Sequence, residues 1–129
     1  MKYLLDTHVL IWLAENSPKL PPEIKEHIVH PKNVIYISSA SLWEITIKLN
    51  LRKLDFKFTL DELLDAIENS DFEMLHINNT HLKSLSVLPS LHKDPFDRLL
   101  IATAVADGLT IITIDENIKK YDVNWTWQK

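Results

Sequence analysis

The stretch from residue 94 to residue 114, DPFDRLLIATAVADGLTIITI, contains the signals for a helix followed by a buried strand. Asp94 stands directly before Pro95, and this pair is typical of a helix with an aspartate cap and proline at its first position. Gly108, the only glycine of the chain, stands where a helix commonly ends. Residues 109–114 are apolar on both faces, so we expect a strand that is covered on both sides.

The rest of the chain shows the same alternation of short apolar runs and helical patterns. We expect further strands at residues 3–5, 34–37, 72–77 and 123–127. We expect further helices at residues 9–14, 23–29, 38–52 and 59–69, from residue 79 or 80 to a point before residue 89, and from residue 115. Because such strands are typical of a parallel sheet covered by helices, we predict an α/β, three-layer fold. Its mostly parallel central sheet has four or five strands, in a single domain that spans residues 1–129.

Composition narrows the possible functions. The chain has 129 residues, 46% of them hydrophobic, and a formal net charge of −4, so any contact with nucleic acid must come from a local patch. The absence of cysteine excludes disulfides and thiolate zinc sites. A glycine-rich phosphate loop is also absent, which disfavours common nucleotide-binding folds. We find no signal-peptide pattern and no apolar run of membrane-spanning length, so we expect a cytoplasmic protein without membrane contact.

Five acidic residues are expected at one edge of the sheet, where parallel strands end and the following helices begin. They are Asp6, Glu44, Asp94, Asp97 and Asp115. Each has a purely structural explanation, because a carboxylate at such a position can cap a helix. Taken together they resist this explanation, since several carboxylates in an apolar fold repel one another and oppose desolvation.

Two of these positions allow a closer comparison of capping with metal binding. Glu44 has the capping-box spacing from Ser41, so it could reach back to the start of its own helix. Asp94 directs its oxygens at the N–H groups of its helix, whereas Asp97 projects from the helix nearly one turn later. We therefore assign Asp94 mainly to capping and Asp97 to a metal ion, and we leave open that Asp94 supports the metal site or binds a second ion.

Oxygen ligands without histidine or thiolate suit a hard divalent cation such as Mg²⁺ or Mn²⁺. A cation of this kind polarises a phosphoryl oxygen, generates hydroxide and stabilises a leaving oxygen. The acidic cluster therefore predicts metal-dependent phosphodiester hydrolysis.

Four segments resemble the PIN-domain ribonucleases, and in particular the VapC-type toxins of bacterial type II toxin–antitoxin systems. They are YLLDTHVLIWLA from residue 3, SSASLWEITIKLNLRKL from residue 38, HKDPFDRLLIATAVADG from residue 92 and IITIDENIKKY from residue 111. The resemblance covers nearly the whole chain, and the block DPFDRLLIATA is its most specific part.

The resemblance implies a PIN-like fold and a metal-dependent endoribonuclease that cleaves single-stranded RNA and leaves 5′-phosphate and 3′-hydroxyl ends. It implies a homodimer and a small antitoxin protein that occludes the pocket. The acidic quartet that it assigns to Mg²⁺ or Mn²⁺ is Asp6, Glu44, Asp97 and Asp115.

Some neighbouring residues are candidates for substrate contact. Lys48, Arg52 and Lys53 form the one compact basic cluster, a candidate RNA-binding patch, although Lys48 could equally form an ion pair with Glu44 one turn away. The hydroxyl of Thr113 could orient a water or a carboxylate, or cap the backbone. Lys93 and Arg98, which flank the acids in the sequence, could contact phosphate or the antitoxin.

Alternative functions remain at this point. A PIN nuclease of RNA processing, rather than a toxin, would carry the same residues. A receiver-like signalling module with an acidic Mg²⁺ pocket would require adjacent acids after the first strand and an aspartate after a middle strand, and the chain has neither. A non-catalytic binding module is disfavoured by the retained acids, and DNA cleavage by the same site stays open.

Overall fold

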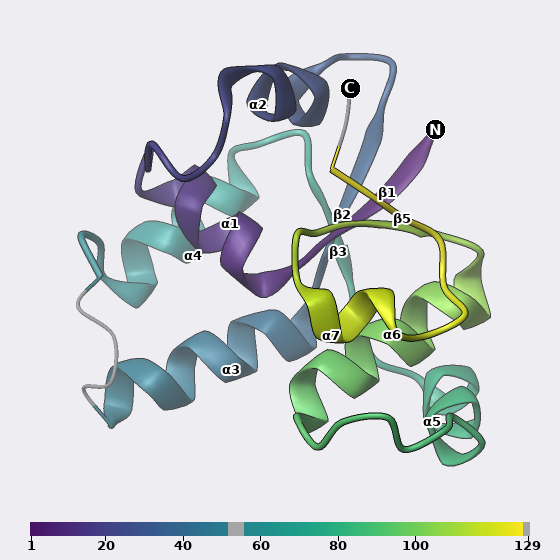
Figure 1. Cartoon of the computed structure of the whole chain (residues 1–129). Helices are drawn as coiled ribbons and strands as arrows, with labels where there is room; N and C mark the ends of the chain where they lie inside the picture. The colour runs from purple at the N-terminus through teal and green to yellow at the C-terminus, as the bar shows by residue number, and fades with distance from the viewer. Residues whose placement is uncertain (52–55, 128–129) are drawn as a thin grey trace.

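The computed structural model describes residues 1–51 and 56–127 and contains a five-stranded sheet between helices (Figure 1). The strands are β1 (Lys2–Leu5), β2 (Val34–Ser38), β3 (Glu73–Leu75), β4 (Thr110–Ile112) and β5 (Trp125–Thr126). Every neighbouring pair is parallel, which confirms the predicted fold class. Within the described residues, no helix is long and apolar enough to cross a bilayer.

The strand order, β3-β2-β1-β4-β5, determines where a site can form. The chain moves outward from β1 through β2 to β3 and then returns to place β4 on the other side of β1. In open parallel sheets, ligands bind at the carboxyl ends of the strands where this reversal occurs. That position lies here between the ends of β1 and β4, which pair with Leu5 opposite Ile112.

Seven helices of the described residues cover the sheet. They are α1 (Thr7–Ala14), α2 (Pro22–Val29), α3 (Ser39–Asn50), α4 (Leu60–Glu68), α5 (Asn79–Ser86), α6 (Pro95–Asp107) and α7 (Glu116–Lys119). Figure 1 shows α1, α2 and α4 on one side of the sheet and α5 and α6 on the other, so that the molecule has three layers.

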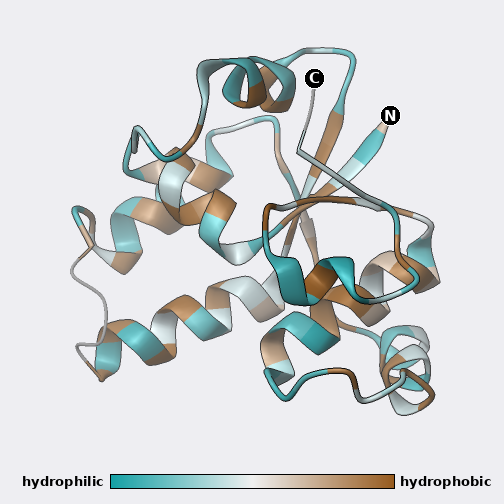
Figure 2. Ribbon diagram, viewed as in Figure 1, coloured by the Kyte–Doolittle hydropathy of each residue, from teal (hydrophilic) through white to brown (hydrophobic). Residues whose placement is uncertain are grey.

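Both faces of the sheet are buried, as the apolar strands predict. Tyr3 and Leu5 of β1 pack into one hydrophobic cluster with α1, α2 and α4, whereas Leu4 packs into a second cluster with α6. In β4, Ile112 joins the first cluster and Ile111 the second. Figure 2 accordingly shows strands that are hydrophobic over most of their length and helices of mixed character.

The predicted limits of α6 are confirmed. Asp94 is its N-cap, and the Oδ1 atom accepts hydrogen bonds from the backbone N–H groups of Phe96 (2.9 Å) and Asp97 (3.1 Å). Gly108 ends the helix in the left-handed conformation, with φ at 66°. Glycine adopts this conformation without the steric penalty that a Cβ atom brings.

Two caps differ from the prediction. The N-cap of α3 is Ser38, whose Oγ accepts from the N–H of Ala40 (3.1 Å), so the capping box predicted for Ser41 is wrong. Ser41 lies inside the helix, where its Oγ accepts a buried hydrogen bond from Thr7 (2.8 Å). The sequence also suggested Asn79 or Thr80 as the cap of the next helix, but Asn78 caps α5.

Candidate functional site

Asp6 follows β1 directly and is almost fully buried. It occupies the N-cap position of α1, yet its side chain makes no capping hydrogen bond. Its Oδ2 instead accepts a hydrogen bond of 2.7 Å from the hydroxyl of Thr113, which follows β4. Its Oδ1 is buried and has no hydrogen-bond partner among the described residues. Asp6 therefore does not have the capping role that the sequence allowed.

Glu44 lies in the second turn of α3 and is only 3% exposed. Its Oε2 forms an ion pair of 2.6 Å with the Nζ of Lys48, which is one of the two roles that the sequence left open for this lysine. Its Oε1 is buried without a partner in the described part of the chain. The capping alternative for Glu44 is wrong, because Ser38 caps the helix.

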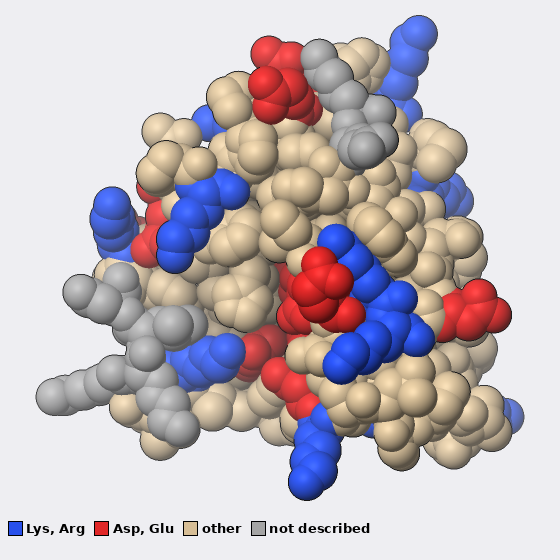
Figure 3. Space-filling view, viewed as in Figure 1, with Lys and Arg blue, Asp and Glu red and all other residues tan. Residues whose placement is uncertain are grey.

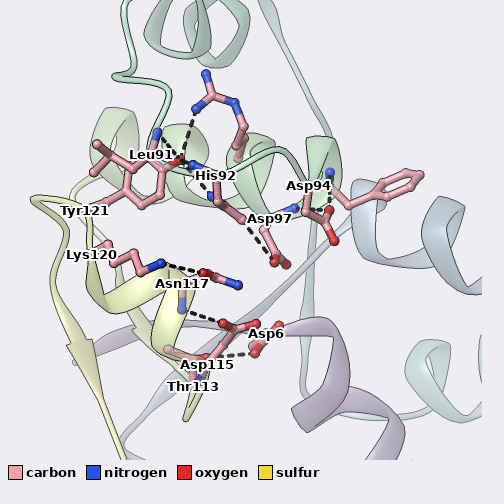
Figure 4. A network of polar contacts seen from close by, with 12 residues as sticks. Asp6, Leu91, His92, Asp94, Asp97, Thr113, Asp115, Asn117, Lys120 and Tyr121 are labelled. Carbon is pink, nitrogen blue, oxygen red and sulfur yellow. Dashed lines mark hydrogen bonds and ion pairs between the residues drawn. The ribbon is translucent and has the colours of Figure 1, made fainter.

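Asp97 lies one turn after the cap residue Asp94, at the start of α6. Figure 4 shows its carboxylate turned toward those of Asp6 and Asp115. Asp94 remains occupied with capping. The cap role predicted for Asp94 is confirmed, while the carboxylate of Asp97 faces the acids at the ends of β1 and β4.

Asp115 and Thr113 connect the end of β4 to the site. The hydroxyl of Thr113 donates to Asp6 and accepts from the backbone N–H of Asp115 at 2.9 Å, so it both orients a carboxylate and caps the backbone. Asp115 caps α7, because its Oδ1 accepts from the N–H of Asn117 at 2.7 Å. It is partly exposed.

The acids interact electrostatically although they come from four segments. Burial, and then the charges of Asp94, Asp6, Asp115 and Glu44, raise the pKa of Asp97 to about 8. Burial and the charge of Asp115 also raise the pKa of Asp6, whereas the hydrogen bond from Thr113, the charge of His8 and the backbone N–H of His8 lower it. Within residues 1–51 and 56–127, no three acidic or histidine side chains are arranged as a complete metal-binding group. The carboxylates therefore lie near one another, but they do not form a complete coordination shell for a metal ion.

Basic side chains surround this acidic cluster. Figure 3 shows acidic side chains gathered near the middle of this face of the molecule, with basic side chains on either side. Lys48 is partly exposed beside Glu44, and Lys93 is exposed. Arg52, predicted as a substrate contact, lies outside the described residues.

The prediction that Arg98 contacts phosphate or an antitoxin is not supported by its position. Its Nη1 donates to the carbonyl of Pro89 (2.7 Å) and to the hydroxyl of Tyr121 (3.0 Å), and its Nη2 donates to the carbonyl of Leu88. These contacts use the guanidinium to hold the segment before α6.

Two residues beside the acids were not singled out from the sequence. His92 lies with its Nε2 at 3.5 Å from Oδ2 of Asp97, and its Nδ1 lies at 2.8 Å from the hydroxyl of Tyr121. His92 stands five residues before Asp97, and that proximity was the available signal. Nothing in the sequence indicates that Tyr121 lies beside it.

Comparisons with known proteins agree with this architecture. A family model described as PIN domain matches residues 3–124. A search of curated proteins gives no match. Among solved structures, one match is VapBC2 from Rickettsia felis, which was solved bound to a DNA fragment from its promoter. It has a TM-score of 0.74 and 20% identity, and the match covers 98% of each chain.

Two further solved structures match over similar lengths. DNA-bound VapBC from Salmonella typhimurium has a TM-score of 0.74 and 20% identity, over 98% of this chain and 97% of that chain. FitAcB from Neisseria gonorrhoeae has a TM-score of 0.66 and 20% identity, over 95% of each chain. At this level of identity the likeness demonstrates a shared fold.

Proposed function

Because the chain belongs to the PIN domain family, we propose that it is an endoribonuclease that depends on Mg²⁺ or Mn²⁺. The proposed ligands are four carboxylates at the carboxyl edge of the sheet: Asp6, Glu44, Asp97 and Asp115. The proposal is supported by the strand order, which brings the segments that carry them to one place.

One observation carries the proposal. Asp6 Oδ1 and Glu44 Oε1 are buried acceptor atoms without a hydrogen-bond partner in the described residues. A buried charged oxygen without a partner is costly, and a hard divalent cation removes this cost. The donor set, which consists of oxygen atoms alone, therefore fits Mg²⁺ or Mn²⁺.

When bound, the divalent cation supplies Lewis acidity toward phosphoryl oxygens and neutralises developing negative charge. The protein supplies the positions of the ligands. Thr113 holds one oxygen of Asp6 so that the other faces the site. Lys48 neutralises Glu44 and, because it is partly exposed, is placed to attract an RNA phosphate.

The proposed biological role is that of the toxin in a toxin–antitoxin pair, acting on cytoplasmic RNA. It is supported by the VapC-type motifs and by the fold shared with VapBC assemblies. In this role the chain would form a homodimer, and a small antitoxin would cover the acidic site.

The direct test is cleavage of single-stranded RNA. We expect the wild-type protein to cleave RNA with Mg²⁺ or Mn²⁺ and to lose this activity in EDTA. Asp6→Asn and Asp97→Asn should each reduce the rate by more than about 100-fold, because removal of a direct ligand costs more than removal of a supporting contact.

Asp65→Asn is the matched control, since Asp65 is an exposed acid on α4, and it should retain full activity. A single-stranded DNA of the same sequence separates ribonuclease from deoxyribonuclease activity. Full RNA cleavage by both Asp6→Asn and Asp97→Asn would contradict the assignment. Growth arrest that needs Asp97 would support the toxin role.

A further inference from the structure

His92 is a buried imidazole that faces one of the proposed ligands. Its Nε2 lies 3.5 Å from Oδ2 of Asp97, and both side chains are about nine-tenths buried. The same nitrogen has no hydrogen-bond partner in the described residues. At 3.5 Å the contact is electrostatic rather than a full hydrogen bond, so its effect depends on whether Nε2 carries a proton.

The surroundings of Tyr121 determine where that proton is. The phenol oxygen accepts from the backbone N–H groups of Leu91 and His92, both at 3.2 Å, and from Arg98 at 3.0 Å. These three groups can only donate. The remaining partner, Nδ1 of His92 at 2.8 Å, is the one that can accept the hydroxyl proton of Tyr121.

The neutral ring of His92 then has its proton on Nε2, because a neutral imidazole carries one N–H and one acceptor nitrogen. We infer that His92 is a positioning residue whose Nε2–H, fixed by Tyr121, orients the Asp97 carboxylate toward the other acids. The effect of this contact on metal binding rests on the proposed function. The position of the proton on the His92 ring does not depend on that function.

The segment before α6, which carries His92, is hydrogen-bonded to side chains from two other parts of the chain. Arg98 from α6 and Tyr121 from the residues after α7 meet on this segment. The position of His92 is therefore defined by two separate elements, which is what orientation of a ligand requires.

The first test measures the tautomer in the wild-type protein. Long-range ¹H–¹⁵N correlation spectra of uniformly labelled protein distinguish the protonated ring nitrogen from the unprotonated one, and His92→Gln assigns the signals. In mildly alkaline buffer we expect Nε2 protonated and Nδ1 unprotonated. A protonated Nδ1 would overturn the inference, whatever the variants do.

The second test measures Mn²⁺ binding by calorimetry. His92→Phe keeps a ring but removes the donor, and we expect it to weaken binding by about 10- to 100-fold. His92→Gln carries an amide N–H in place of Nε2–H and should recover most of that loss. Equal affinity in wild type and His92→Phe, or equal loss in the two variants, would overturn the inference.

The chain offers a matched control in a second histidine–aspartate contact. Nε2 of His81 lies 2.9 Å from Oδ2 of Asp107, at the opposite end of α6. His81→Gln should change the melting temperature without changing Mn²⁺ affinity. If the wild-type protein binds no Mn²⁺, the proposed function fails; if it binds Mn²⁺ and His92→Phe binds equally well, only the role of His92 fails.

Discussion

Asp97 is a carboxylic acid whose surroundings oppose its ionisation. Its pKa is raised from 3.8 to about 8 by burial and by neighbouring carboxylates. The unfolded chain releases this proton near the ordinary pKa, whereas the folded, metal-free protein keeps it until about pH 8. Between these values the folded state binds more protons, so ionisation of Asp97 makes the protein less stable as the pH rises.

We therefore expect Asp97→Asn to stabilise the metal-free protein relative to wild type. The difference in free energy of unfolding should grow from about pH 4 to about pH 8 and then level off, because above the folded pKa both states are ionised. Urea denaturation in EDTA at several pH values measures it. A difference in free energy of unfolding that does not change with pH would show that the fold does not raise the pKa of Asp97.

At the level of elements, the start of α6 is stabilised by its cap residue Asp94, which is not one of the four proposed metal ligands. Asp94→Ala should lower the free energy of unfolding by about 1 kcal/mol, because it leaves the N–H groups of Phe96 and Asp97 without their acceptor. Asp94→Asn keeps the acceptor and should keep both stability and Mn²⁺ affinity. Thermal melts and Mn²⁺ titrations of the two variants separate the roles.

A loss of Mn²⁺ binding in Asp94→Asn, at unchanged stability, would instead make Asp94 a ligand. This alternative is the one that the sequence left open. The cap uses only Oδ1 of Asp94 for both backbone hydrogen bonds, so the Mn²⁺ titration decides between the two roles.

Caps were predictable from the sequence where the signal is local. The Asp94–Pro95 pair fixes the start of α6, and the capping box of Thr59 and Glu62 fixes the start of α4. The start of α3 was predicted correctly, but the capping box considered at Ser41 does not form, because residues 38–41 are all serine or alanine and only packing decides which serine is the cap. In α5, His81 replaces the usual glutamate of a capping box, so the pattern was not recognised.

For the whole molecule, the edge that gathers the acids was predictable and the contacts between them were not. Parallel strands place their carboxyl ends together, which follows from the apolar pattern of each strand. The hydrogen bond from Thr113 to Asp6 joins residues 107 positions apart, and the meeting of His92 with Tyr121 depends on how α7 packs. No local spacing contains that information.

The central claim is that carboxylates from distant segments bind one divalent cation. Calorimetric titration of the wild-type protein with Mn²⁺, beside Asp6→Asn, Asp97→Asn and the control Asp65→Asn, tests it most directly. We predict saturable binding by the wild type and the control, and binding weakened by more than about 100-fold in the other two variants. Absence of Mn²⁺ uptake by the wild type, or unchanged binding in both Asp6→Asn and Asp97→Asn, would contradict the claim.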